Sequence, residues 1–165
     1  MSLDADIAAI AAQEAALVFD SFDEDAAFRL GCLIREEAAR RAAPVAIDIR
    51  TAARILFATT LPGSSADNAD WIRRKSALVL RTHRSSYGFG RELAQKGGTL
   101  GAEIGLPPTD YAAHGGGFPI RLHGTGVIAC LTISGLPQRE DHRLATWGIC
   151  RALGFEPAAH DLPTP

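Results

Sequence analysis

The chain has 165 residues, of which 47% are hydrophobic and 22% charged, and its formal net charge is −2. That length fits one domain, and that composition supports a packed core beneath a solvated surface. A near-neutral charge lacks the basic footprint by which proteins bind nucleic acid or anionic membranes. We therefore expect a single domain over residues 1–165 that binds neither.

The N-terminal segment is acidic, with Asp4, Asp6 and Glu14 and no early Lys or Arg, which is unlike a secretory signal. No apolar run reaches the roughly 18 residues that a membrane helix needs. These observations predict a cytoplasmic protein.

Residues 3 to about 14 are rich in alanine and predict a short helix that buries little surface and is weakly anchored. Residues 17–19 are a short apolar run that predicts a strand. Ser21 and Glu24 match a capping box for a helix that covers about 23–42.

Two strands follow, because residues 45–49 alternate apolar with small or polar side chains and residues 55–58 return after a turn at 51–54. A second long helix is predicted at about 67–84. It precedes about 30 residues rich in Gly and Pro, in which residues 87–96 predict a short helix.

Residues 118–122 and 127–133 flank a Gly-Thr-Gly turn and predict a second hairpin. The last helix is predicted at 138–153, with Gly154 at its C-cap. Because hairpins imply antiparallel pairing, we expect an α/β domain of the α+β type: a five-stranded antiparallel sheet with helices packed on it.

Five segments carry a family resemblance: AIDIR at 46–50, DNADWIRRK at 67–75, HRSSY at 83–87, HGGGFPI at 114–120 and SGLPQREDH at 134–142. In this order they resemble the haem-degrading-domain (GlcG-like) family, and more narrowly its small cytosolic branch of uncharacterised proteins. The resemblance covers roughly residues 19–153. It implies a profilin-like fold with the sheet between helical layers, oligomers built from dimers, and haem as a ligand that some members bind or degrade.

The helix predicted at 67–84 carries an arginine face of Arg73, Arg74, Arg81 and Arg84. Clustered guanidinium groups bind carboxylates in a bidentate way, so this face suits haem propionates or the acids of a partner subunit. The alternative is a solvated charged face. His83 lies on the apolar side of this helix, where it is either a hydrogen-bonded core residue or an iron ligand.

His114 is followed by Gly115, Gly116 and Gly117, which let a backbone approach a ligand closely or adopt a positive φ. The long loop leads directly to them, so His114, Gly115 and Gly116 are candidate ligand-binding residues, and the alternative is a tight entry into a strand. Asp141 opens the last helix on its inward side. It either orients a ligand-binding histidine or pairs with an arginine of the other long helix.

Two functions therefore stay open. In the first, the protein binds a small anionic ligand, with haem as the candidate cofactor and His83 or His114 as the iron ligand. In the second, it is a non-enzymatic homo-oligomer, with an interface formed by the loop at 87–111 and by Trp71. Neither reading assigns a catalytic residue, and no motif with metal-ligand spacing is present.

Overall fold

A four-stranded antiparallel sheet in the order β2-β1-β4-β3 lies at the centre of the computed structural model, which describes residues 2–164. Its strands are β1 (Ala46–Arg50), β2 (Ile55–Thr60), β3 (Gly117–Leu122) and β4 (Gly126–Ser134). The helices are α1 (Leu3–Ala16), α2 (Glu24–Arg40), α3 (Asp67–Thr82), α4 (Ser86–Gln95) and α5 (Gln138–Leu153), with short 3-10 helices η1 (Ala102–Ile104) and η2 (Pro157–His160). The expected α+β class with an antiparallel sheet is confirmed.

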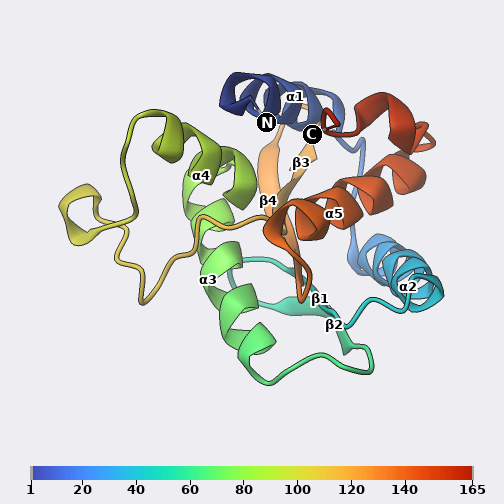
Figure 1. The fold of residues 1–165 in the computed structure, drawn as a ribbon. Helices are drawn as coiled ribbons and strands as arrows, with labels where there is room; N and C mark the ends of the chain where they lie inside the picture. The colour runs from blue at the N-terminus through green and yellow to red at the C-terminus, as the bar shows by residue number, and fades with distance from the viewer. Residues whose placement is uncertain (1, 165) are drawn as a thin grey trace.

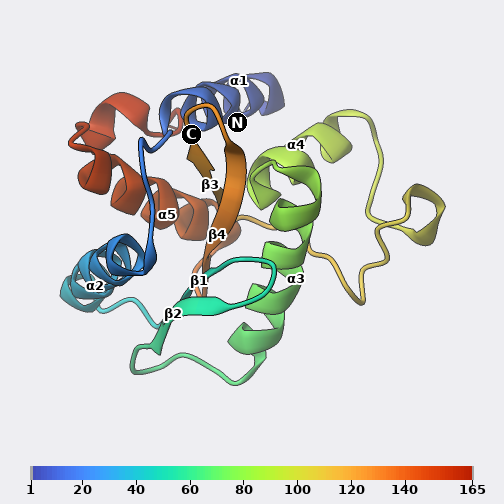
Figure 2. The same cartoon turned by 180° about the vertical axis from the view of Figure 1, so that it is seen from behind.

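Helices cover both faces of the sheet, with α2 and α5 on one face and α3 on the other (Figures 1 and 2). On the face beneath α2 and α5, Ile47 pairs with Ile133 and Ile49 pairs with Leu131 across β1 and β4. All four side chains are buried and belong to the main hydrophobic core. This face therefore supplies most of the apolar burial that stabilises the fold.

The opposite face of the sheet is more polar. Because side chains alternate along a strand, Asp48 on β1 and its partner Thr132 on β4 point away from the apolar core, toward α3. Both residues are buried. Arg50 donates two hydrogen bonds of 2.6 and 2.8 Å to the carboxylate of Asp48, which keeps this buried charge paired.

Local signals predicted most element boundaries correctly. Both hairpins form as expected. The helix α3 begins at the expected residue, Asp67, and α5 covers the expected range of 138–153. Gly154 ends α5 in the left-handed conformation, with φ of +78°. The start of α2 differs from the prediction, because Asp23, rather than a box of Ser21 and Glu24, caps the helix by accepting a hydrogen bond of 2.8 Å from the backbone N–H of Ala26.

The expectation of a fifth strand at residues 17–19 was wrong. The helix α1 continues to Ala16, and only Phe19 reaches the sheet, where it forms a single parallel bridge with Leu122 of β3. Its backbone makes two hydrogen bonds there, of 2.8 and 3.0 Å. The extended stretch is too short for a ladder, because the cap of α2 at Asp23 follows almost at once.

The Gly- and Pro-rich segment after α4 extends beyond α3 and α4, away from the sheet (Figures 1 and 2). Two arginines of α3 hold it: Arg73 donates 2.7 Å to the carbonyl of Thr109, and Arg81 donates 2.9 Å to the hydroxyl of Tyr111. Tyr87, by contrast, is a residue of α4 with only 2% of its surface exposed. It is therefore not the interface residue that the sequence suggested. No helix within residues 2–164 is long and apolar enough to cross a membrane.

Candidate functional site

The side chain of His114 stands between two hollows on the α3 side of the molecule. The first, which we term the polar hollow, has a volume of about 260 Å³, and the second, the apolar hollow, has about 310 Å³. The polar hollow is lined by Asn68, Trp71, Lys75, His114, Ser134, Gly135, Leu136, Gln138 and Asp141. The apolar hollow lies between α4 and the segment after it, and its lining includes Arg74, Leu93, Leu100, Pro108, Tyr111 and His114.

His114 is exposed and packs edge-to-face on Trp71, with 4.9 Å between the ring centroids. Partial burial lowers the pKa of His114, and the positive charges of Lys75 and Arg74 lower it further. A lowered pKa keeps the imidazole neutral near pH 7, and the neutral ring is the form that binds a metal. The exposed ring is thus available to a ligand in either hollow.

The glycines after His114 serve the packing of the protein's own backbone. A Cβ added at Gly115 would lie 1.8 Å from the carbonyl oxygen of Gln138, and one at Gly116 would lie 2.1 Å from that of Ile133. Gly116 also has a φ of +124°, which side chains of L-residues rarely tolerate. The close approach is therefore to α5 and β4, as in the alternative of a tight entry into β3, and it positions His114; an approach to a ligand stays a prediction.

A buried ion pair forms the floor of the polar hollow. The ammonium nitrogen of Lys75 lies 3.0 Å from Oδ2 of Asp141 and donates 3.0 Å to the carbonyl of Ile133. The other carboxylate oxygen of Asp141 accepts 2.9 Å from the backbone N–H of Leu136. Burial lowers the pKa of Lys75 and raises that of Asp141, while each charge counteracts the shift of the other.

One of the two sequence readings of Asp141 paired it with an arginine of α3, and that was wrong, since the partner is Lys75. One signal pointed to this residue: among 17 basic residues only Lys75 and Lys96 are lysines. Lys75 also lies between Ile72 and Val79 on the inward side of α3, with 2% of its surface exposed.

The four arginines of the predicted arginine face do not converge on one ligand-binding site. Arg81 contacts the segment after α4, as does Arg73, which also pairs with Asp70 at 2.9 Å. Arg74 pairs with the same carboxylate at 2.7 Å and stacks over Trp71, 4.2 Å from its ring centroid.

Arg84 lies just beyond the end of α3 and ties it to α1 and α4. Its guanidinium group pairs with Glu14 and Glu92, each at 2.7 Å. Of the four arginines, Arg74 is the one that lines the apolar hollow beside His114.

His83 is the C-cap of α3, exposed and in the left-handed conformation, rather than a residue on its apolar side. Trp71, which contacts His114, lies twelve positions earlier on the same helix. At a rise of 1.5 Å per residue, Trp71 and His83 lie roughly 18 Å apart along α3, so His83 and His114 belong to different surfaces.

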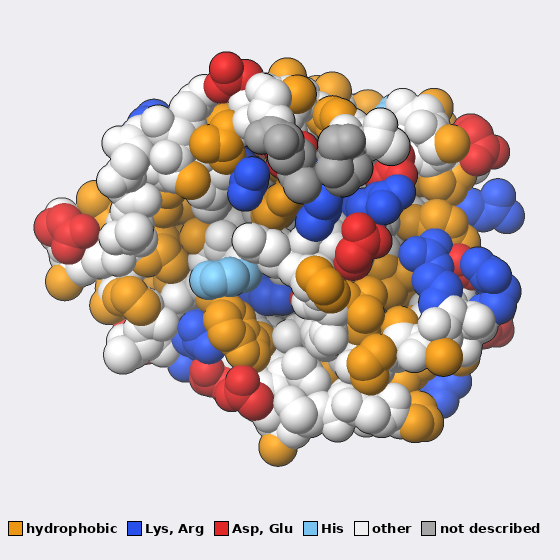
Figure 3. All heavy atoms as spheres, viewed as in Figure 1, with side chains coloured by type: hydrophobic (Ala, Val, Ile, Leu, Met, Phe, Trp, Pro, Cys, Tyr) orange, Lys and Arg blue, Asp and Glu red, His pale blue; other side chains and the backbone are white. Residues whose placement is uncertain are grey.

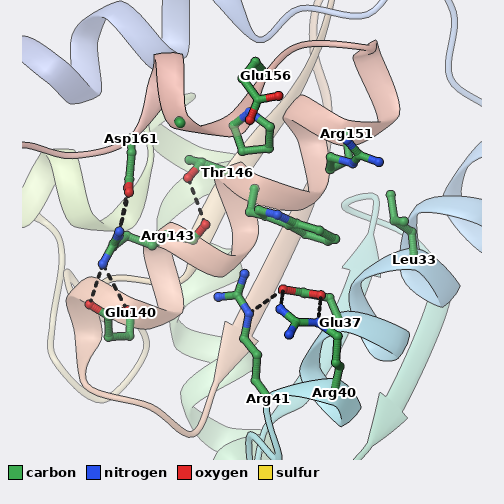
Figure 4. Close-up of a pocket in the computed structure, with 13 residues that line it drawn as sticks. Leu33, Glu37, Arg40, Arg41, Glu140, Arg143, Thr146, Arg151, Glu156 and Asp161 are labelled. Atoms are coloured by element: carbon green, nitrogen blue, oxygen red, sulfur yellow. Dashed lines mark hydrogen bonds and ion pairs between the residues drawn. The ribbon is translucent and has the colours of Figure 1, made fainter.

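A larger hollow of about 530 Å³ lies between α2 and α5, as Figure 4 shows. Three of the four arginines that line it are paired within the chain: Arg40 and Arg41 each lie 2.7 Å from Glu37, and Arg143 contacts Glu140 and Asp161, while the fourth, Arg151, is exposed. An anion that bound to Arg40, Arg41 or Arg143 would have to compete with these carboxylates. Figure 3 likewise shows basic and acidic side chains interspersed over one face of the molecule, without a continuous basic patch.

Comparison with known proteins identifies the family. Residues 22–150 match the family described as "Haem degrading protein HbpS-like". The chain belongs to this HbpS-like haem-degrading protein family. The resemblance seen in the sequence is thereby confirmed.

One relative of this chain, a "UPF0303 protein" of Acidobacterium capsulatum, is 50% identical over 163 residues, which cover 99% of each chain. The crystal structure of the Ybr137w protein shares 34% identity with a TM-score of 0.79, and the match covers 88% of this chain and 86% of that one. The structure titled "PduOC:Heme Complex" shares the fold at 20% identity, with a TM-score of 0.67, and the match covers 79% of this chain and 94% of that one.

Within residues 2–164 no cluster of three or more His, Cys, Asp or Glu side chains is placed to hold a metal ion by itself.

Proposed function

We propose that this protein binds haem, or a similar flat anionic aromatic ligand, in the apolar hollow, with His114 as the iron ligand and Arg74 as the partner of a carboxylate. The observation that carries this proposal is the position of His114, a neutral exposed imidazole at the edge of an apolar surface. A relative whose solved structure is a haem complex shares the fold, which supports the choice of ligand.

The residues of the hollow fit haem in kind. Leu93, Leu100 and Tyr111 offer an apolar surface to a porphyrin face, and a histidine is the commonest protein ligand of haem iron. Arg74 offers a guanidinium group to a propionate, although it must share that group with Asp70. Bound haem would supply an iron centre for oxygen or electron-transfer chemistry.

The other residues singled out in the sequence have supporting parts in this proposal. Gly115 and Gly116 hold His114 in place, while Arg73 and Arg81 hold the segment that forms one wall of the hollow. Arg84 joins α3 to α4, which forms the other wall. Asp141 stays with Lys75, and His83, which lies on a different surface, is the alternative iron ligand only for a site outside the apolar hollow.

Titration of the purified protein with haem tests the proposal. We expect a Soret shift that saturates at one haem per chain, is lost in His114→Ala and is retained in His83→Ala. Arg74→Gln should weaken binding about tenfold, because one charge-assisted hydrogen bond contributes on the order of 1.5 kcal/mol. Loss of the shift in His83→Ala with retention in His114→Ala would contradict this assignment.

We also propose that the protein is a homo-oligomer built from dimers, through the surface of β2 and α2 rather than the loop at 87–111. Ile55 on β2 is 59% exposed and Phe28 on α2 is 61% exposed. Phe28 packs on Phe57 of β2, with 6.2 Å between ring centroids, so the exposed apolar surface of α2 reaches this strand. β2 is also an edge strand, whose outer backbone groups are free to pair with a second copy.

A further inference from the structure

The buried lysine of the polar hollow has no role in the proposed binding of haem. The protein uses arginine at nearly every basic position, yet a lysine stands at a position where the charge is almost fully removed from water. An arginine remains charged in proteins, whereas a lysine amine can lose its proton when it is buried. A lysine here therefore supplies chemistry that the common basic residue of this chain lacks.

The geometry around Lys75 is that of an amine with its own proton acceptor. Its nitrogen contacts Oδ2 of Asp141 and the carbonyl of Ile133, each at 3.0 Å, so two of its three N–H groups are engaged. The third position is left for a molecule in the polar hollow, which Lys75 lines. Burial lowers the pKa of Lys75 and raises that of Asp141, which favours transfer of a proton from the amine to the carboxylate.

We propose that Lys75 forms a reversible imine with a small carbonyl compound that enters the polar hollow, and that Asp141 transfers the protons of this reaction. Lys75 first gives a proton to Asp141 and its nitrogen then attacks the carbonyl carbon, forming a C–N bond. Asp141 protonates the carbonyl oxygen and takes a proton from the new C–N nitrogen. It returns that proton to the hydroxyl group, which leaves as water. The products are a protonated imine and one water, so charge is conserved and no oxidant or reductant is needed.

The lining of the hollow indicates the class of carbonyl compound. Asn68 and Gln138 carry amide groups, and Ser134 carries a hydroxyl that accepts a 3.2 Å hydrogen bond from Asn68 and keeps its own proton to donate. Oε1 of Gln138 accepts a hydrogen bond of 3.4 Å from Gly115, which leaves the amide N–H₂ as a donor to an oxygen of the ligand. A hollow of about 260 Å³ with these donors suits a small 2-oxo acid.

Reductive trapping tests the proposal. The native protein, without haem, is incubated with pyruvate and cyanoborohydride near pH 7, and its peptides are analysed by mass spectrometry. Lys96, which is exposed, and the N-terminal amine are controls within the same molecule. We expect the reduced adduct on Lys75 to form at least tenfold faster than on Lys96. Propanal is an aldehyde and more reactive with every amine, but it lacks the carboxylate, so its ratio of labelling at Lys75 to labelling at Lys96 should be lower than that of pyruvate.

Two variants separate chemistry from folding. Lys75→Arg should show no adduct at position 75, and Asp141→Asn should retain the amine but form the adduct at least tenfold more slowly, because proton transfer contributes roughly 10²–10⁴-fold to such reactions. Circular dichroism melting establishes that each variant is folded. Labelling confined to Lys96 and the N-terminal amine, or labelling of Lys75 only after denaturation in urea, would overturn the proposal. Binding of haem by a folded Lys75→Arg protein would show that the two sites are independent.

Discussion

His142 is a buried histidine that links α5 to α1. Its Nε2 lies 2.8 Å from Oε1 of Gln13, which fixes that nitrogen as the donor, and its ring packs against Tyr87 and Phe118 with centroid distances of 5.2 and 5.8 Å. Its Nδ1 is buried and has no hydrogen-bond partner within residues 2–164. A second proton would therefore be placed on an atom without an acceptor. Burial, with the charge of Arg139 adding to it, lowers the pKa of His142 to about 3.

This shift predicts a pH dependence of stability. The unfolded chain binds a proton at His142 near pH 6.5, whereas the folded chain resists protonation until about pH 3. The contribution of a neutral His142 is therefore fully present above about pH 6.5 and is lost as the pH falls below it. Each unit of pH between these values costs about 1.4 kcal/mol, so the free energy of unfolding should fall by ~2 kcal/mol between pH 6.5 and pH 5.

Urea unfolding at several pH values measures this effect. The variant His142→Gln, which can still donate to Gln13, should remove most of the slope between pH 6.5 and pH 5. His123→Gln is the matched control, since His123 is exposed at the turn between β3 and β4 and should leave the slope unchanged. A slope that is the same in His142→Gln as in the wild type would contradict the assignment.

At the scale of elements, α1 is held by buried polar groups as well as apolar ones. Its alanine-rich sequence predicted a weakly anchored helix, yet Asp6 is fully buried. Both oxygens of its carboxylate accept 2.8 Å hydrogen bonds from Arg139 of α5, and Arg91 of α4 lies 3.5 Å away. The carboxylate joins three helices, so Asp6 is one of the side chains that fix the position of α1.

Loss of this charge should release α1 locally. In Asp6→Ala the two arginines lose a buried partner, and breaking a buried ion pair costs about 3–5 kcal/mol. Hydrogen exchange followed by mass spectrometry should show faster exchange in residues 3–16 with little change in the strands. Asp4→Ala is the control, because Asp4 is exposed on the same helix. Equal protection of α1 in Asp6→Ala and Asp4→Ala would show that the carboxylate of Asp6 does not anchor the helix.

At the scale of the whole molecule, the apolar surface of β2 and α2 predicts self-association. Light scattering on the wild type at micromolar concentration should give the mass of a dimer or a multiple of it. Ile55→Lys should weaken the association at least tenfold, since a lysine on an edge strand opposes pairing with a second copy. Phe155→Lys is the matched control, as Phe155 is 40% exposed after the end of α5. A mass of one chain that does not change on dilution would refute self-association.

The sequence by itself determined the local structure of this protein. Hairpin turns, helix starts and the glycine at the end of α5 follow from backbone preferences that act within a few residues, and four of the five expected strands formed where the alternation of side chains placed them. The ordered segments from 46 to 142 also identified the family. The run at 17–19 failed because pairing with a sheet depends on which edge is near, and that is not a local property.

Only the tertiary structure decided which side chains meet. Lys75 and Asp141 are 66 residues apart, and Arg84 and Glu14 are 70 apart, so no periodicity within a helix relates them. The helix pattern placed Arg73, Arg74 and Arg81 on one face, but the chain folded acids, a carbonyl and a tyrosine onto that face and divided the arginines among separate partners. Whether His114 is exposed and Lys75 buried depends on how α3, α5 and the glycine segment pack together, because burial is a property of the assembled elements and not of any one of them.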